Sequence, residues 1–300
     1  MPGNLTITID PSRSPLDAVR LAASRGLLPS ALSSKEQQEA LSEAMRELSV
    51  FSARTTNAHY LQTVRDVINQ VLSGDMDLPL ARLTLRRTLD SLGYTPEGGF
   101  PEDEVGLIPP AVEGTLTALD SDERLNLMLD TQVALQRGRG QRDRGNTAAA
   151  VRAFPAWELV RVGSRDKRRN WESRWRRAGG KFYDGRMIAL KNDPFWGELG
   201  SSSNYDDALD VATPPFAFNS GMGWRGVSRD EAVKLGVVVT DGDETFTVDD
   251  AMPPKIKASS EGLDEDFVKR LQAELKAEKA KDGTLTISDI VRKNLERNEG

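Results

Sequence analysis

The side chains best suited to chemistry in this sequence are arginines interleaved with tryptophans. A guanidinium can grip a phosphate or a carboxylate through two N–H groups, and it can also lie on the face of an indole ring. The candidate binding residues are Arg161, Arg165, Arg168, Arg169, Arg174, Arg176 and Arg177. Together they could bind nucleic-acid phosphate or the groove of a partner protein. We favour the plainer alternative, in which the tryptophans form a core and the arginines surround it.

These arginines belong to a basic belt, defined here as residues 137–186. The belt contains fifteen Lys and Arg against five Asp and Glu, although the whole chain has a formal net charge of −6. The residues on either side are therefore strongly acidic. Such a belt could face phosphate or an acidic protein partner, or it could pair internally with the acidic ends of the same chain.

Catalytic groups are scarce. With no cysteine, the chain has no disulfide, thiolate zinc site or cysteine nucleophile. His59 is the only histidine and lies in a helical pattern, so a metal site or a Ser-His-acid triad is not expected. Gly138-Arg139-Gly140 departs from the dinucleotide fingerprint, because Asp143 stands at its last position. Adjacent acids such as Asp206-Asp207 and Asp249-Asp250 are more often solvated than metal-bound. We predict no catalytic, cofactor or metal site, and hence no enzyme.

Length and composition are those of a globular protein. The 300 residues are 38% hydrophobic and 29% charged, which allows one large or two ordinary domains. We expect no membrane association, because no run approaches the roughly 18 apolar residues that a membrane helix needs. The start lacks a basic segment followed by an apolar one, so we expect synthesis in the cytoplasm.

The elements that would hold the arginines follow from apolar spacing. Residues 1–13 predict a terminal arm, because Leu5–Ile9 alternates like a strand. Residues 14–94 predict a helical region, whose first helix begins at Ser14-Pro15 and ends at Gly26. Three more helices are expected there: one after Ser34 through Leu41, Met45, Leu48 and Phe51, one from Leu61 to Leu72, and one from Pro79 to Gly93.

The remaining sequence divides into a connector, a second domain and a tail. Gly and Pro crowd residues 95–119, which predicts a connector. Residues 120–250 predict a domain that opens with a long helix capped by Ser121 and continues as short apolar pieces separated by Gly and Pro. We expect a hairpin near its end, formed by Val237–Val239 and Thr245–Val248.

Residues 251–300 predict a helical tail. One amphipathic helix carries Phe267, Leu271 and Leu275, and a second is capped by Ser288. The predicted fold class is therefore α+β: a mostly helical N-terminal half, an irregular Trp/Gly/Pro-rich α+β domain, and C-terminal helices.

Several uncommon sequence words follow one another in the second domain. They are Thr131-Gln132 with Gly138-Arg139, Pro155-Ala156-Trp157-Glu158, Arg169 to Trp175, Ala178-Gly179-Gly180, Ala189 to Trp196, and Pro214 to Met222. In this order the words resemble the phage Mu F-like head morphogenesis proteins, also called minor head or minor capsid proteins. The resemblance covers about residues 40 to 236 and is most specific from residue 154 onward.

The resemblance implies a phage or prophage protein that acts in capsid assembly at or near the portal. It implies the portal and the major capsid protein as partners, with packaged DNA as a further contact of the basic belt. The protein would lie in the host cytoplasm during assembly, and then in the virion, inside the head or near the portal.

One departure from the family limits what the resemblance implies. Many relatives carry an Asn-Cys-Arg-Cys word after the paired prolines and a histidine downstream, whereas this chain reads Asn219-Ser220-Gly221-Met222 and has no histidine there. No metal-binding or hydrolytic role carries over. The resemblance does imply a scaffold in which rigid turns anchor aromatic side chains. The turns are rigid because proline fixes its own φ and restricts the backbone of the preceding residue. The residues of this scaffold are Trp157, Trp171, Trp175, Asp193, Pro194, Trp196, Pro214, Pro215 and Asn219.

Two alternatives stay open. The first is an enzyme module, such as an ADP-ribosyltransferase-like or nuclease domain carried by a phage structural protein; it predicts a pocket where Arg, Ser and Glu or clustered acids converge. The second is a non-specific DNA-binding accessory protein, which requires one continuous exposed stripe of arginines.

Overall fold

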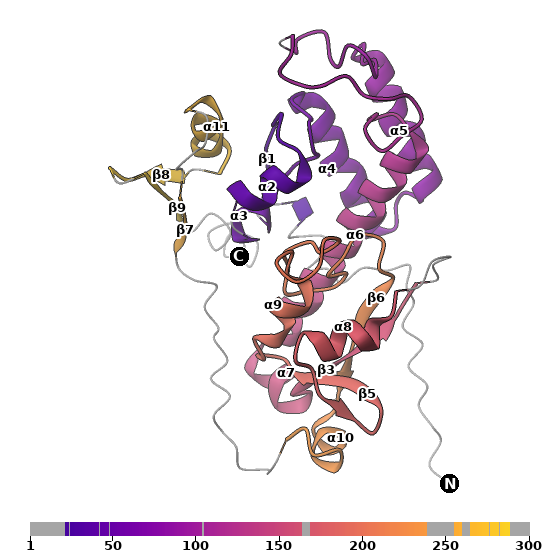
Figure 1. Cartoon of the computed structure of the whole chain (residues 1–300), viewed down its shortest axis with the longest axis vertical. Coiled ribbons are helices and arrows are strands. Elements are labelled where there is room, and N and C mark those ends of the chain that lie inside the picture. The colour runs from indigo at the N-terminus through magenta and orange to yellow at the C-terminus, as the bar shows by residue number, and fades with distance from the viewer. Residues whose placement is uncertain are drawn as a thin grey trace.

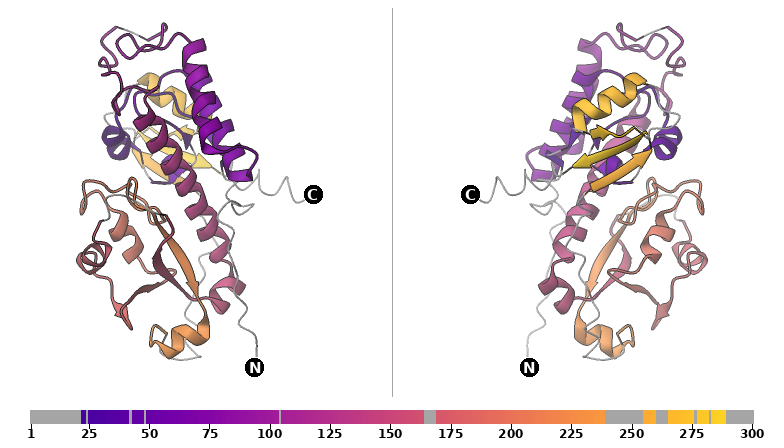
Figure 2. Two further views of the ribbon diagram at one scale, coloured as in Figure 1. Left: turned by 90° about the vertical axis from the view of Figure 1, so that its right-hand side faces the viewer. Right: turned by 90° about the vertical axis from the view of Figure 1, so that its left-hand side faces the viewer.

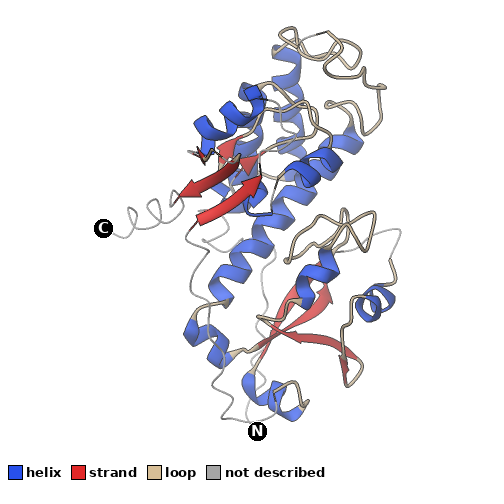
Figure 3. Cartoon of the chain, turned by 60° about the vertical axis from the view of Figure 1, so that its left-hand side comes forward, coloured by secondary structure: helices blue, strands red, loops and turns tan. Residues whose placement is uncertain are grey.

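A computed structural model of the chain describes residues 22–23, 25–41, 43–47, 49–103, 105–163, 169–238, 255–259, 265–275, 277–281 and 283–288. Two lobes lie at opposite ends of an elongated molecule, and the long helix α6 runs through both (Figures 1 and 2). A small C-terminal unit lies beside the helical lobe (Figure 3). The described residues form an α+β fold, as predicted.

The helical lobe is built from α4, α5 and the first half of α6. Side-chain caps set where these helices begin: an oxygen of Asn57, Asp77 or Ser121 accepts a hydrogen bond from a backbone N–H in the first turn. Gly74 ends α4 with a left-handed φ of 87°. The bounds are α4 (Ala58–Ser73), α5 (Leu78–Ser91) and α6 (Asp122–Gly145).

The predicted apolar stripes form the core of this lobe. Leu61, Val64 and Ile68 of α4 are buried with Leu85 and Leu89 of α5. α6 closes the core with Leu125, Met128, Leu129 and Val133. The predicted connector runs between α5 and α6, and its described residues form no helix or strand.

The chain before α4 differs from the single long helix expected after Ser34. Ser33 does cap a helix there, in a reciprocal capping box with Glu36. That helix ends after seven residues, however, and a short helix and a strand follow it. The strand β2 pairs in parallel with β1, which contains Gly26, the residue expected to end a helix. The bounds are β1 (Gly26–Leu27), α2 (Ser34–Ala40), α3 (Glu43–Glu47) and β2 (Ser49–Val50).

The Trp lobe holds an antiparallel sheet of order β4-β5-β3-β6. Trp157 in the central strand β3 lies opposite Ala189 of β5 and Gly226 of β6. Its strands are β3 (Ala156–Arg161), β4 (Phe182–Tyr183), β5 (Arg186–Leu190) and β6 (Met222–Val227). Its short helices are α7 (Ala148–Ala153), α8 (Trp171–Arg177), α9 (Phe195–Gly200) and α10 (Arg229–Lys234).

The C-terminal unit corrects the prediction of an all-helical tail. Its helix α11 contains the expected Phe267, Leu271 and Leu275, but it lies beside a three-stranded antiparallel sheet of order β7-β9-β8. Thr284–Ser288 alternates in the manner of a strand, so the signal for β9 was present in the sequence. The bounds are β7 (Lys255–Ser259), α11 (Glu265–Leu275), β8 (Ala277–Lys279) and β9 (Thr284–Ser288).

Four expected elements lie wholly or mostly outside the described residues. They are the terminal arm 1–13, the helix from Ser14, the strand Thr245–Val248 of the hairpin, and the helix after Ser288. Among the helices that the structure describes, none is both long and apolar enough to cross a bilayer.

Glycines let backbone segments approach each other closely in the Trp lobe. A Cβ on Gly200, at the end of α9, would lie 1.9 Å from the carbonyl oxygen of Val211. Gly197, one turn earlier on the same helix, has nothing within 4 Å of such a Cβ. Comparing substitutions at Gly200 and Gly197 therefore distinguishes the effect of steric contact from the effect of helix propensity.

We expect Gly200→Ala to destabilise the protein by about 2 kcal/mol or more, because a backbone carbonyl must move. Gly197→Ala is the matched control and should stabilise by about 0.5–1 kcal/mol, the advantage of Ala over Gly in a helix. Chemical denaturation measures both. Equal effects of the two substitutions would contradict the close approach of α9 to Val211.

Candidate functional sites

The predicted arginines fall into separate environments. Arg165 and Arg168 lie outside the described residues. Arg161 is exposed at the end of β3 and donates to the Ser220 carbonyl at 3.4 Å. Arg169 donates to the Phe218 carbonyl at 2.7 Å and forms an ion pair with Asp207.

Arg174 is buried and ties α8 to the loop that follows α9. Its side chain is 7% exposed, its Nε donates to the Leu199 carbonyl at 3.1 Å, and its Nη1 donates to Asp207 at 2.6 Å. The guanidinium carbon lies 3.8 Å from the ring centroid of Tyr205 and 4.9 Å from that of Trp171. Asp207 thus neutralises two arginines, which explains one member of the acid pair noted in the sequence.

Arg176 and Arg177 are exposed on α8. Arg176 approaches Glu172 at 3.7 Å, one turn away, and lies over Phe182. The described arginines of the candidate set therefore divide into two held by Asp207 and three at the surface.

Other arginines of the basic belt pair internally with acids from distant parts of the chain. Arg139 and Arg142 of α6 contact Glu47 of α3, at 3.2 and 3.0 Å. Burial opposes ionisation of Glu47, but the two guanidinium groups together hold its pKa below the usual value. Part of the basic belt thus forms ion pairs with an acidic residue of the N-terminal region. This agrees with the interpretation in which the belt pairs internally.

A second network lies on the sheet. Glu158 of β3 accepts hydrogen bonds from Arg186 of β5 and Arg225 of β6, and both arginines also contact Glu231 of α10. Partial burial raises the pKa of Glu158, but the bonds from Arg186 and Arg225 outweigh it, and the net shift is downward. This network connects strands β3, β5 and β6 with helix α10, so we assign it a role in stabilising the Trp lobe.

The tryptophans form the core of the Trp lobe, as we favoured. Trp157, Trp171 and Trp196 are 5%, 4% and 2% exposed. Trp157 stacks on Trp224 with centroids 5.3 Å apart and an interplanar angle of 2°. Trp175 is fully buried and meets the edge of Trp196.

The two proline-containing turns anchor aromatics in this core. Asp193 accepts a hydrogen bond from the Phe195 N–H at 2.9 Å, and the indole of Trp196 donates to the Leu190 carbonyl at 2.8 Å. The Pro214-Pro215 bond is cis, and the next residue, Phe216, is buried with its ring stacked on Trp196. Asn219 has a positive φ of 52° and its carbonyl accepts from Arg169.

Lys191 is an anchor that the sequence analysis did not single out. Its ammonium group donates to the Gly145 carbonyl at 2.8 Å and lies 4.2 Å from the ring centroid of Trp157. Burial lowers its pKa to about 8. The amine caps the C-terminal end of α6 and so joins that helix to the Trp lobe. No spacing rule could find this contact, since its partner lies 46 residues away.

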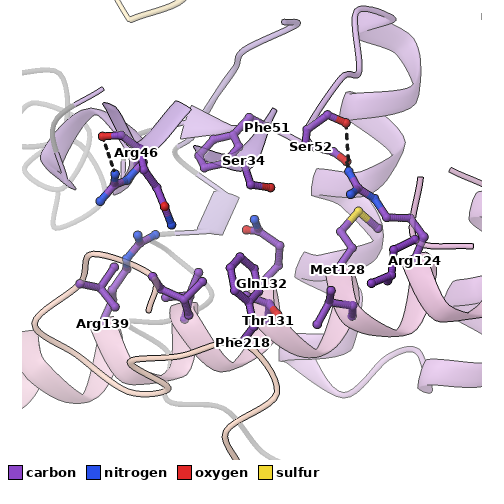
Figure 4. Close-up of a pocket in the computed structure, with 17 residues that line it drawn as sticks. Ser34, Arg46, Phe51, Ser52, Arg124, Met128, Thr131, Gln132, Arg139 and Phe218 are labelled. Carbon is purple, nitrogen blue, oxygen red and sulfur yellow. Dashed lines mark hydrogen bonds between the residues drawn. The ribbon is translucent and has the colours of Figure 1, made fainter. Parts of the chain in front are cut away.

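A pocket of about 320 Å³ lies where the lobes meet (Figure 4). We call it the junction pocket. α6 contributes one side, and α2, α3 and the segment after β2 face it. The loop between α9 and β6 supplies Leu209, Val211 and Phe218, and the connector supplies Leu116. Its lining residues are Ser34, Gln38, Arg46, Phe51, Ser52, Ala53, Leu116, Arg124, Leu127, Met128, Thr131, Gln132, Leu135, Arg139, Leu209, Val211 and Phe218.

The junction pocket has the groups of a binding site. Three arginines line it, whereas no carboxylate, lysine or imidazole is present among the described residues that do so. The lining of this pocket brings Arg and Ser together without the Glu or clustered acids that the enzyme alternative also named. No three His, Cys, Asp or Glu side chains in the described part of the chain are grouped as metal ligands.

Comparison of the chain with protein-family models, with curated proteins and with solved structures finds no match.

The central position of Trp196 predicts a large effect on stability. We expect Trp196→Ala to lower the free energy of unfolding by about 3–5 kcal/mol, the range for deleting a buried aromatic side chain. Phe154→Ala is the control, because Phe154 is 46% exposed, and it should cost less than about 1 kcal/mol. Denaturant titration followed by circular dichroism measures both. A cost below about 1 kcal/mol for Trp196→Ala would make this indole a surface contact residue.

Proposed function

We propose that this protein is a phage or prophage minor head protein with a structural role in capsid assembly, acting at or near the portal. One observation carries the proposal: the sequence words that resemble the head morphogenesis family pack against one another. Trp157, Trp171, Trp175 and Trp196 come from three of these words and Phe216 from a fourth, and all five side chains belong to one core.

The word from α6 belongs to the same arrangement. Gly138 lies so close to the paired prolines that a Cβ there would be 2.2 Å from the Pro214 carbonyl oxygen. The sequence words that resemble the family thus contact one another in a single core, as expected if together they form one scaffold. Independent surface motifs would have no physical reason to meet.

The helical lobe supplies a surface for the proposed protein partner. Large apolar side chains are exposed on α5 and on the connector, and exposed apolar surface is a feature of protein interaction sites. They are Leu80, Leu83, Leu107, Val112 and Leu116, which are 48%, 42%, 51%, 64% and 48% exposed. We propose that this surface contacts the portal or the major capsid protein.

Co-expression with the portal protein of the same phage tests the assembly role. We expect the two proteins to co-purify, and we expect the double substitution Leu80→Asp/Leu83→Asp to abolish the complex, since it places charge on the apolar surface. Val233→Asp, at a 40% exposed position on α10 of the other lobe, should leave the complex intact. Binding to neither portal nor major capsid protein would contradict the proposal.

The same role can be tested in the particle. A phage that lacks residues 154–236 should produce absent or malformed heads, because the deletion removes the scaffold core. Normal infectious particles from this phage would rule out a role in assembly.

We further propose that the exposed arginines of the basic belt face packaged DNA. Each phosphate that an arginine neutralises releases about 0.9 of a counterion, so the salt slope counts the contacts. Replacing Arg161, Arg176 and Arg177 by Gln should reduce the log–log slope for duplex DNA by about 3, with little dependence on base sequence. Arg87→Gln, an exposed position on α5, should leave the slope unchanged.

Fluorescence anisotropy at several salt concentrations measures these slopes. If the wild-type chain shows no binding at roughly 50 mM salt, or if the triple variant keeps the full slope, the exposed arginines serve protein contacts.

A further inference from the structure

Of the three arginines that line the junction pocket, Arg124 carries positive charge that no described carboxylate neutralises, whereas Arg139 pairs with Glu47 and the Asp210, Glu43 and Glu47 carboxylates attract Arg46. At one end, Arg124 donates from Nη2 to the Ser52 hydroxyl at 2.8 Å and to the Ala53 carbonyl at 3.0 Å (Figure 4). Both acceptors are neutral, and no described carboxylate forms an ion pair with Arg124. Its Nε is buried without a hydrogen-bond partner.

The opposite end holds two more guanidinium groups (Figure 4). Arg46 is 6% exposed and donates only to backbone carbonyls, including that of Asp210 at 2.6 Å. Arg139 pairs with Glu47, which Arg142 shares. Behind the pocket, Arg25 is 2% exposed and donates to the Gln132 side chain and the Ala22 carbonyl, with no ion pair among the described residues.

This arrangement is costly without a counter-charge. Carbonyl and hydroxyl oxygens accept hydrogen bonds from Nη atoms of Arg124 and Arg46, but they supply no net negative charge to offset the desolvation of a buried cation. Burial accordingly lowers the pKa of Arg124 and of Arg46. An anion that enters the pocket would supply the missing charge and hydrogen-bond to the Arg124 Nε.

The rest of the lining is suited to an apolar body. Leu135, Leu209 and Val211 form a small buried cluster with Phe218 packed against it. Thr131 adds a buried hydroxyl oxygen that has no hydrogen-bond partner. An apolar pocket with a few placed polar groups is the usual form of a small-molecule site.

We propose that the junction pocket binds a small organic anion, with its apolar body among the Leu135, Leu209 and Phe218 side chains and its carboxylate against Arg124. A free small molecule fits better than an extended peptide, because the pocket, which α6, α2 and the loop after α9 line, has a volume of about 320 Å³, which is room for one compact body. The anion would contact both lobes at once and hold them together. This site is independent of the proposed role in head assembly.

Isothermal titration of the full-length chain with octanoate tests the proposal. Octanol has the same apolar body without the charge, and octylamine has the opposite charge. Octanoate should bind and raise the melting temperature, octanol should bind at least about tenfold more weakly, and octylamine should not bind, because the charge-assisted bond to Arg124 is lost.

Two substitutions locate the site. Arg124→Gln should weaken octanoate binding by about tenfold or more, whereas Arg86→Gln, at a partly exposed arginine of α5, should leave it unchanged. Ala53→Leu fills the pocket without removing a charge, so it should block octanoate even if Arg124→Gln fails to fold. Circular dichroism establishes that each variant is folded.

A second measurement reports on the carboxylate itself. The carbon-13 resonance of carboxyl-labelled octanoate should titrate at lower pH when bound than when free, because an adjacent guanidinium favours the ionised form.

Four results would overturn the proposal. They are no heat and no thermal shift with octanoate, equal affinity for octanoate and octanol, unchanged binding in folded Arg124→Gln and Ala53→Leu variants, and binding of an acidic–apolar peptide without binding of octanoate. The last result would make the pocket a protein docking site.

Discussion

The close contact of one helix with both lobes is the constraint on which the rest of this structure depends. α6 has 24 residues and spans about 36 Å, so it is long enough to serve two cores. Its first half carries the leucines of the helical lobe, and its second half carries Gly138 and Gly145. A Cβ at Gly145 would lie 2.4 Å from the ring of Trp157, so only glycine lets the Trp lobe come this close.

Arginine is the main connector between segments far apart in the sequence. Arg174 reaches Asp207 across 33 residues, and Arg142 reaches Glu47 across 95. A planar guanidinium can bond several carbonyls and a carboxylate at once, which suits it to loops whose backbone has few partners of its own. Much of the basic belt is therefore occupied inside the molecule, and its local charge overstates the charge available to a partner.

Other polar side chains connect the two lobes beside the junction pocket. α2 and α3 reach the Trp lobe through polar contacts: Gln38 donates to the Ala208 carbonyl, and Glu43 accepts from the Ala212 N–H. Polar links at the rim hold the lobes together without filling the space between them. An apolar interface would have closed that space by packing.

Sequence patterns predicted those helices whose formation depends mainly on residues close to one another in the sequence. The apolar spacing in α4, α5 and α6 and the predicted cap at Ser121 depend on contacts between residues close in sequence. The prediction was wrong after Ser34, because β2 is stabilised by pairing with β1, more than 20 residues earlier. The prediction for the tail was incomplete. It identified helix α11 from its apolar spacing but missed strand β9, although the residues of β9 alternate between apolar and polar.

The sequence by itself determined the α+β composition, the apolar faces of α4, α5 and α6 and the burial of the tryptophans, because a large apolar ring in a globular chain is most stable in the core. Only the tertiary structure decided which arginines form internal ion pairs and which are exposed to solvent. Charge attracts over any sequence separation, so the choice of partner depends on where Asp207, Glu47 and Glu158 come to lie. The junction pocket is likewise decided by tertiary structure, since its sides come from segments that meet only after α6 has placed both lobes.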